Sequence, residues 1–298
     1  MKANRHDDGI AQALRDRLNC NEVISVSPIG GGCINEAYCY STDVGSFFVK
    51  INKNAAIQMF EGEVRGLKSL YESHSVRVPK VFFCDQLPNG GSFLVLEYIK
   101  LGTAREWTQR DLGGGLADQH LCTEESRFGF HVDNTIGSTP QINTWMEEWV
   151  SFFARFRLQY QLDLAFIKSG DELMRDCGHR LLDRLPGYFE GQEISPSLLH
   201  GDLWSGNMAV DEQGHAVIYD PAVYYGHHEA ELGIMGMFGG FTEDFYKAYH
   251  EKIPEAEGFK ERRELYKLYH YLNHLNIFGS SYYSFYYEKP DVSRTGYL

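Results

Sequence analysis

The pattern of apolar residues changes once along this chain, near residue 101, and this change constrains the fold more than any other feature. Before it, five short runs rich in β-branched and aromatic residues alternate with turn formers, and one amphipathic helical pattern, AAIQMFEGEVRGLKSLYES, separates the third run from the fourth. After it, helical spacing dominates residues 104–128 and 142–187. We therefore predict an α+β, bilobal fold, with a five-stranded antiparallel sheet and one main helix in residues 1–100 and a mostly helical lobe in residues 101–298.

Two stretches of the second lobe depart from the helical pattern. GFHVDNTIGSTPQIN is rich in turn formers and predicts an irregular connection. SLLHGDLWSGNMAVDEQGHAVIYDP is strand-like at both ends, with a loop after His200 and a turn at Gln213–Gly214, and helices rich in Tyr and Phe resume from residue 224. The second stretch is therefore predicted to be a loop that leads into a β-rich hairpin.

The composition is that of an ordinary globular protein and excludes several classes of function. Of 298 residues, 43% are hydrophobic and 23% are charged, and the formal net charge is -13. No dense Lys/Arg cluster is present, so we expect no nucleic-acid partner. The N-terminus lacks the apolar core of a signal peptide, and no apolar run reaches the about 18 residues of a membrane span, so no membrane association is expected.

Six cysteines occur, and none forms a CxxC pair. A zinc site of the usual kind is therefore not expected, and a disulfide framework is unusual in a chain this long and this poor in cysteine. This usage predicts a reducing, cytoplasmic compartment.

The strongest chemical signal is HGDLWSGN, from His200 to Asn207, followed by Asp220 in YDP. Phosphoryl transfer needs a group that accepts the proton of the substrate hydroxyl, and oxygen ligands that hold Mg²⁺ on the nucleotide phosphates. Asp202 and Asn207, five residues apart on one loop, can divide these tasks, with Asp202 as base and Asn207 as metal ligand. Asp220, eighteen residues after Asp202, supplies the second metal ligand, because Mg²⁺ prefers hard oxygen donors.

A lysine suited to the nucleotide phosphates lies in the third β-like run. Lys50 follows the glycine-rich turn by about 18 residues and needs a carboxylate to hold it. The next helical pattern offers Glu61 and Glu63, which lie on different helix faces. Glu63 is the preferred partner because it precedes the apolar stripe residue Val64, and Glu61 remains the alternative.

Two further segments are candidates for contacts with the nucleotide. Gly30, Gly31 and Gly32 would let backbone N–H groups approach phosphates without obstruction by a Cβ atom, although they do not match the Walker pattern GxxxxGK[ST]. A linker at the end of the fifth run would offer backbone groups to an adenine ring, at Glu97, Tyr98 and Ile99.

These motifs resemble those of the fructosamine/ketosamine-3-kinase family, within the aminoglycoside-phosphotransferase and choline-kinase-like group. The resemblance is carried by HGDLWSGN and IYDPAVYYGHHEAELGIMGMFGGF, and by GGGCIN, FVK, FEGE, FLVLEY, DNTIGSTPQIN and LNHLNIFG, which together cover nearly the whole chain. It implies a bilobal protein-kinase-like fold, ATP and Mg²⁺ as cofactors, and phosphorylation of the 3-hydroxyl of a ketosamine on a small molecule or a protein. DP at Asp220 in place of DFG, with no APE segment, distinguishes the chain from protein kinases.

The resemblance also implies roles for individual residues. Asp202 becomes the base, Asn207 and Asp220 the metal ligands, Lys50 and Glu63 the ion pair, and residues 97–99 the adenine hinge. Candidates for the substrate pocket are Trp204, whose flat face suits a sugar ring, and Tyr224, Tyr225 and His274.

Two other readings stay open at this point. A kinase of the same fold that acts on choline, an aminoglycoside or another sugar would share the loop chemistry and differ in its acceptor pocket. A catalytically dead binding module would usually lack the base, a metal ligand or the lysine, and all of these are present.

Cys33 directly follows the three glycines, in the loop expected to cover the phosphates. Backbone N–H groups and Lys50 would lower the pKa of its thiol and favour oxidation. The sequence leaves the oligomeric state open, and a disulfide between the Cys33 residues of two molecules would give a redox-linked dimer.

Overall fold

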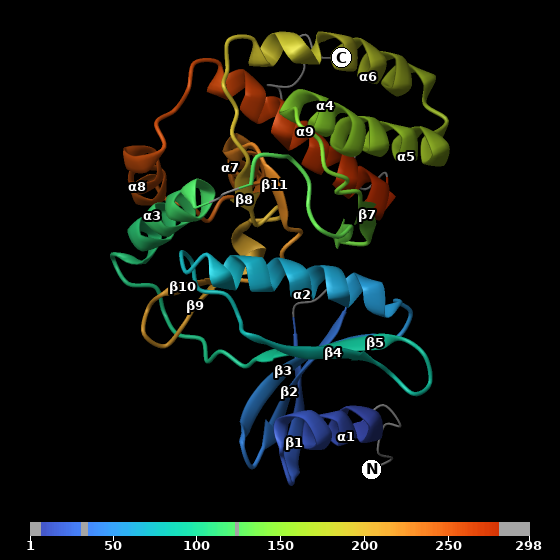
Figure 1. Ribbon diagram of the computed structural model, residues 1–298, viewed down its shortest axis with the longest axis vertical. Helices are drawn as coiled ribbons and strands as arrows, with labels where there is room; N and C mark the ends of the chain where they lie inside the picture. Colours follow the sequence, from blue (N-terminus) through green and yellow to red (C-terminus); the bar gives the residue numbers. More distant parts are fainter. Residues whose placement is uncertain (1–6, 31–34, 123–124, 280–298) are drawn as a thin grey trace.

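The computed structural model describes residues 7–30, 35–122 and 125–279 (Figure 1). The first part of the chain folds, in order, into α1 (Asp7–Leu18), β1 (Val23–Ile29), β2 (Glu36–Thr42), β3 (Gly45–Asn52), α2 (Ile57–Glu72), β4 (Val81–Gln86) and β5 (Ser92–Glu97). The middle part contains α3 (Thr108–Leu121), β6 (Asn134–Ile136), β7 (Thr139–Gln141), α4 (Trp149–Phe153), η1 (Ala154–Gln159), α5 (Tyr160–Ser169), α6 (Glu172–Arg184) and η2 (Leu185–Phe189). The last part contains β8 (Ser197–Leu199), η3 (Ser205–Asn207), β9 (Met208–Val210), β10 (Ala216–Ile218), β11 (Tyr224–Gly226), α7 (His228–Phe238), α8 (Glu243–Lys252) and α9 (Phe259–Phe278).

The first five strands form one antiparallel sheet in the order β1-β2-β3-β5-β4, as predicted. Strand β5 is buried on both faces because its alternate side chains enter two different cores. Phe93 and Val95 pack with α1, whereas Leu94 and Leu96 pack with α2. Figure 1 shows the result: α2 lies between the sheet and the helical lobe, and α1 lies against the opposite side of the sheet.

Helix α2 contributes to the larger core, which continues into the helical lobe. Phe60, Leu67 and Leu70 are fully buried there together with residues of α3, α7 and α9. The helix is thus a packed contact between the lobes as well as a part of the first one. The division into residues 1–100 and 101–298 stays a prediction.

The helical segments that the sequence predicts for the second lobe are longer than the helices of the structure. The pattern at 104–128 forms only α3, because Phe128 pairs with Met146 in an extended bridge that excludes a helix at both positions. The pattern at 142–187 begins as a helix only at Trp149 and is divided at Gly170, whose φ of 67° ends α5. The connection expected to be irregular contains the β6–β7 hairpin.

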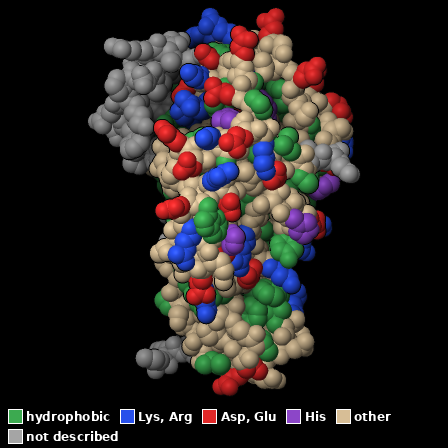
Figure 2. Space-filling model, turned by 90° about the vertical axis from the view of Figure 1, so that its left-hand side faces the viewer, with side chains coloured by type: hydrophobic (Ala, Val, Ile, Leu, Met, Phe, Trp, Pro, Cys, Tyr) green, Lys and Arg blue, Asp and Glu red, His purple; other side chains and the backbone are tan. Residues whose placement is uncertain are grey.

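The predicted hairpin after His200 is present, with β9 and β10 paired across a turn at Gly214. All cysteines within the described residues are free thiols. No helix in the described ranges is long and apolar enough to cross a membrane. On the face that carries α3 and α8, basic and acidic side chains are interspersed (Figure 2).

Candidate active site

The loop between β8 and β9 places Asp202 on the side of the helical lobe that faces the sheet. Gly201 has a φ of 83°, and a Cβ atom on it would overlap the carbonyl oxygen of Ala222. Gly206 lies beneath the Trp204 ring, which would likewise overlap a Cβ atom. Both glycines of HGDLWSGN are therefore required by close approach, which explains the motif in steric terms.

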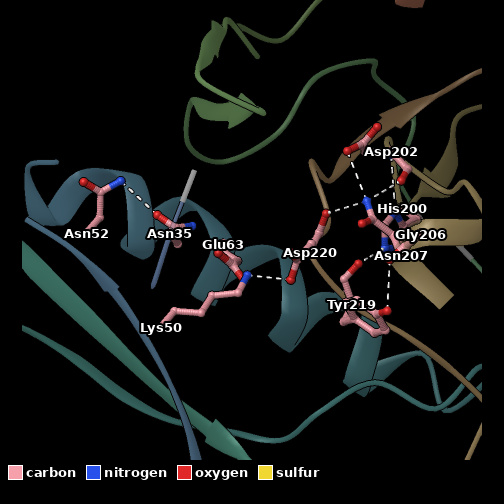
Figure 3. A network of polar contacts seen from close by, with 10 residues as sticks. All are labelled: Asn35, Lys50, Asn52, Glu63, His200, Asp202, Gly206, Asn207, Tyr219 and Asp220. Atoms are coloured by element: carbon pink, nitrogen blue, oxygen red, sulfur yellow. Dashed lines mark hydrogen bonds and ion pairs between the residues drawn. The ribbon is translucent and has the colours of Figure 1, made fainter. Parts of the chain in front are cut away.

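Asn207 holds the Asp202 side chain (Figure 3). Its Nδ2 donates to the Asp202 carbonyl oxygen at 2.8 Å and to Asp202 Oδ2 at 3.1 Å. Protein surrounds most of this carboxyl group, and burial raises the pKa of Asp202 well above its ordinary value, although the bond from Asn207 opposes the shift. Because Nδ2 makes these bonds, Asn207 Oδ1 remains available as a ligand.

His200 links the backbone at Asp202 to the backbone at Tyr219, the residue before Asp220. Its Nε2 donates to the Tyr219 carbonyl oxygen at 3.0 Å, and its Nδ1 accepts from the Asp202 N–H at 3.3 Å. Burial lowers the pKa of His200, so the ring is neutral and this arrangement defines its tautomer. His200 is thus a structural link between Asp202 and the residue before Asp220.

Glu231, in α7, anchors the backbone of the loop between β8 and β9, the candidate catalytic loop, and was missed from the sequence. Its buried carboxylate accepts from the N–H of His200 at 2.5 Å and from the N–H of Gly201 at 3.2 Å. Burial raises the pKa of Glu231, but the nearby His120 and His200 rings and the N–H of Gly201 outweigh burial, so the net pKa is lowered. Thirty residues separate the partners, so no local spacing could have identified them.

Lys50, Glu63 and Asp220 form the second part of the site (Figure 3). Lys50 Nζ lies 2.6 Å from Glu63 Oε1 and 2.5 Å from Asp220 Oδ1. Burial lowers the pKa of Lys50, but the two carboxylates outweigh burial and raise it, so the ammonium group stays charged. The structure brings Glu63 to Lys50, whereas Glu61 is exposed to solvent.

Asp220 occupies an unusual backbone conformation. Its φ of 57° lies in the left-handed region, which non-glycine residues adopt only when the surroundings enforce it. Its side chain is 45% exposed, unlike that of Lys50 at 6%. One carboxylate oxygen pairs with Lys50, and together with Asn207 Oδ1 it offers the hard oxygen donors that Mg²⁺ prefers.

The segment proposed as an adenine hinge directly follows β5, and the next residues along the chain, 100–102, pair with the β9–β10 hairpin. The Glu97 side chain accepts from Arg77 Nη2 at 3.0 Å and from the Lys80 N–H at 3.1 Å, so it points away from a nucleotide site. The backbone groups of Tyr98 and Ile99 have no backbone partner within the described part of the chain. The backbone donors and acceptors of Tyr98 and Ile99 are therefore available to an adenine ring, whereas the Glu97 carboxylate is not.

Gly30 is the part of the glycine-rich segment that lies within the described residues. It follows β1, and a Cβ atom on it would meet nothing within 4 Å. Gly31, Gly32 and Cys33 lie outside the described residues. The predictions on them stay predictions.

The candidates for the substrate pocket have different surroundings. Trp204 and His274 both contact the Phe238 ring, with ring centroids 5.1 Å and 5.5 Å apart, and so lie on one side of the catalytic loop. Tyr224 is only 4% exposed and stacks on the rings of a buried aromatic cluster. Tyr225 is half-buried and stacks on Trp145. The structure thus brings Trp204 and His274 together and places Tyr224 in the core.

One group of potential metal ligands lies elsewhere, at His227, His228 and Glu229. Both carboxylate oxygens of Glu229 are already bonded to Arg262 at 2.7 Å, and His227 Nδ1 is bonded to the Tyr266 hydroxyl. A bound cation would have to displace a guanidinium group, so this cluster is best described as a packed polar core.

Comparison with known proteins places this geometry in a family. Residues 7–289 match the sequence profile described as fructosamine kinase. A protein-ribulosamine 3-kinase of Oryza sativa subsp. indica, named as chloroplastic, is 50% identical over 277 residues, which cover 93% of this chain and 80% of the relative. A ketosamine-3-kinase of Mus musculus is 42% identical over 294 residues, which cover 90% of this chain and 94% of the relative.

Solved structures agree with the fold. A candidate fructosamine-3-kinase from Haemophilus somnus has a TM-score of 0.84 at 27% identity and covers 96% of this chain and 95% of that one. A spectinomycin phosphotransferase in complex with ADP and spectinomycin has a TM-score of 0.58 at 15% identity, covers 97% of this chain and 92% of that one, and therefore shows the shared fold alone. With a profile match over nearly its whole length and relatives at 42% and 50% identity, this chain belongs to the fructosamine kinase family.

Proposed function

We propose that this chain is an ATP- and Mg²⁺-dependent ketosamine 3-kinase, which phosphorylates the 3-hydroxyl of ketosamines. The observation that carries the proposal is the convergence of Asp202 with the Lys50–Asp220 pair through one residue, Asn207, which lies between them (Figure 3). Relatives named for ribulosamine and ketosamine substrates support the acceptor class.

The residues suggest how the tasks are divided. Lys50, held by Glu63, binds the phosphates of ATP, and the backbone at Tyr98 and Ile99 binds the adenine. Mg²⁺, held by Asn207 and Asp220, supplies charge neutralisation on the transferring phosphoryl group. The acceptor oxygen attacks the γ-phosphorus, the bond from this phosphorus to the bridging oxygen of ADP breaks, and Asp202 takes the proton of the hydroxyl.

The raised pKa of Asp202 suits this role, because a stronger base accepts the hydroxyl proton more readily. Trp204 and His274 would contact the sugar from the side of α9, which places the acceptor next to Asp202. A role of Tyr224 in contacting the substrate is not supported by its position in the core.

Two predictions from the sequence are not tested by the structure or by the comparisons. The cytoplasmic location stays a prediction, and the rice relative is named as chloroplastic. The redox-linked dimer through Cys33 stays a prediction as well.

Phosphorylation assays test the proposed function directly. The enzyme would be incubated with ATP, Mg²⁺ and either a ribulosamine or a fructosamine, with choline and kanamycin as control alcohols. We expect a product whose phosphorus NMR signal couples to the proton on carbon 3 of the sugar. Phosphorylation of a control alcohol without any ketosamine product would contradict the acceptor class, and the absence of all transfer would contradict the activity.

A further inference from the structure

The β6–β7 hairpin carries a buried group of polar side chains that contacts the backbone after Asp220. We call this group, formed by Asn134 and Gln141 with Tyr269 of α9, the junction. Asn134 and Gln141 face each other across this hairpin and are 7% and 2% exposed. Buried amide side chains need partners for every donor and acceptor, so their bonds define what the hairpin holds.

The junction holds the backbone that directly follows the Asp220-Pro221 pair. Gln141 Nε2 donates to the Ala222 carbonyl oxygen at 3.0 Å and to Asn134 Oδ1 at 2.9 Å. Asn134 Nδ2 donates to the Val223 carbonyl oxygen at 2.8 Å. Two successive carbonyl groups, at the second and third residues after Asp220, are thus fixed by one hairpin.

The same junction reaches a helix on the acceptor side. The Tyr269 hydroxyl, in α9, donates to Gln141 Oε1 at 2.8 Å, so that each side-chain nitrogen and oxygen of the two amides has at least one partner. Fully bonded buried networks are rigid, because any displacement leaves a polar atom without a partner.

The helix that carries Glu63 packs directly on the junction. A Cβ atom on Gly62 would lie 2.9 Å from Asn134 Cβ, and one on Gly66 would lie 2.8 Å from Val223 Cγ2. Both glycines allow α2 to approach to contact distance. The two carboxylates that pair with Lys50 are therefore held against the same small group of residues.

We propose that Gln141 is a positioning residue that holds Asp220 where it binds Mg²⁺, with Asn134 and Tyr269 as its partners. The left-handed backbone of Asp220 is strained, and such a conformation persists only where neighbouring contacts fix it. The bonds to Ala222 and Val223 are contacts of this kind. This inference rests on the proposed function, since it assigns the metal to Asp220 and Asn207.

The consequence is specific to the metal. Without the junction, the Asp220 segment can relax, and nucleotide binding should lose the part that Mg²⁺ contributes. Binding in the absence of Mg²⁺ should change little, because Lys50 keeps its pairing with Glu63 and the hydrogen bonds of the junction go to Ala222, Val223 and Tyr269, not to Tyr98 or Ile99. A general loss of stability would weaken both kinds of binding or neither.

The test is calorimetric titration of ADP into Gln141→Met, with Mg²⁺ and with EDTA, and no acceptor is needed. We expect the gain in affinity from Mg²⁺ to fall by about tenfold, as is typical when a residue supporting a metal ligand is removed, with affinity in EDTA unchanged. Amide hydrogen exchange in residues 222–226 of the nucleotide-free protein should accelerate in the same variant.

The matched control is Asn143→Leu. Asn143 is equally buried and lies two residues after Gln141, but it bonds to Val132 and Arg157 and not to the Asp220 segment. It should lower the unfolding temperature and leave the Mg²⁺ gain at the wild-type value. An equal loss of the Mg²⁺ gain in both variants would overturn the inference.

A milder variant decides the question if Gln141→Met does not fold. Tyr269→Phe keeps the ring and removes one bond, and we expect it to reduce the Mg²⁺ gain by about threefold, the worth of one net hydrogen bond. An unchanged Mg²⁺ gain in whichever of these variants folds would overturn the role of the junction. No Mg²⁺ gain in the wild-type protein would instead overturn the proposed function itself.

Discussion

The two aspartates of the site have opposite surroundings. Asp220, on the nucleotide side, is nearly half exposed and pairs with the ammonium group of Lys50. Asp202, on the acceptor side, is surrounded by protein, and its side chain is held by the neutral amide of Asn207, so burial raises its pKa well above the ordinary value.

The difference supports the proposal that two carboxyl groups of one small site perform two different tasks. A carboxylate next to a lysine and near solvent suits an exchangeable metal ion and its nucleotide. A carboxylate with a raised pKa suits proton acceptance. Asn207 touches both sides, because its Nδ2 bonds to Asp202 while its Oδ1 is left for the metal.

The largest expected effect comes from removing the base. Asp202→Asn keeps the shape of the side chain and should reduce turnover of a ketosamine by about 10²–10⁴-fold, the usual contribution of a general base. Single-turnover measurements with saturating ATP would show this. If the variant retains more than about a tenth of the wild-type rate, Asp202 does not act as the base.

Loss of the loop anchor should have a smaller effect on the acceptor side. Glu231→Gln replaces one of the two acceptor oxygens with an NH₂ donor, so that a donor faces the N–H of Gly201 or of His200, which should cost about 1–3 kcal/mol for an unsatisfied buried group. We expect turnover to fall by about tenfold, since 1.4 kcal/mol corresponds to that factor.

The control for Glu231 lies two residues away on α7. Glu229→Gln breaks a buried pair with Arg262 and should also lower the unfolding temperature. Because Glu229 does not bond to the catalytic loop, turnover of the folded control should stay near the wild-type value. Equal losses of turnover in the two variants would show that stability alone is responsible.

The pH dependence sharpens the comparison between the aspartates. Asp202 must be ionised to accept a proton, and its pKa is raised, so turnover should fall as the pH falls, beginning well above the ordinary value of 3.8. Below that pKa the rate should drop by about tenfold per pH unit. Rates constant down to pH 4 in protein that circular dichroism shows to be folded would contradict the raised pKa.

The smallest effect concerns stability and involves neither aspartate. Burial lowers the pKa of His228 and His270 to about 3 in the folded protein. The unfolded chain binds protons below pH about 6.5 and the folded chain does not, so the free energy of unfolding should decrease as the pH falls from that value toward 3. Each histidine contributes at most about 1.4 kcal/mol per pH unit.

Urea unfolding at pH 7.5, 6.0 and 5.0 measures this slope. His228→Asn should make the slope shallower by up to one proton. Equal slopes for wild type and His228→Asn would show that His228 is not neutral in the folded protein.

Much of the fold, and the pairing of Lys50 with Glu63, could be predicted because the signals are local. The five strands lie in short runs rich in β-branched and aromatic residues that turn formers separate, and Lys50, Asp202 and Asn207 each lie in a short motif with its own chemistry. Glu231 and Gln141 act across thirty and eighty residues, and no local spacing identifies them. Tyr224 and Trp204 look alike as aromatic candidates, and only packing places one in the core and the other beside the catalytic loop.

The most direct test of the division of labour is nucleotide binding by Asp202→Asn and Asp220→Asn, each titrated with ADP in Mg²⁺ and in EDTA. We predict that Asp220→Asn loses the affinity gained from Mg²⁺, because neutral amides hold this ion poorly, and that Asp202→Asn keeps it. Loss of the gain in Asp202→Asn with its retention in Asp220→Asn, or equal behaviour of the two variants, would contradict the assignment of the metal to one aspartate and the proton to the other.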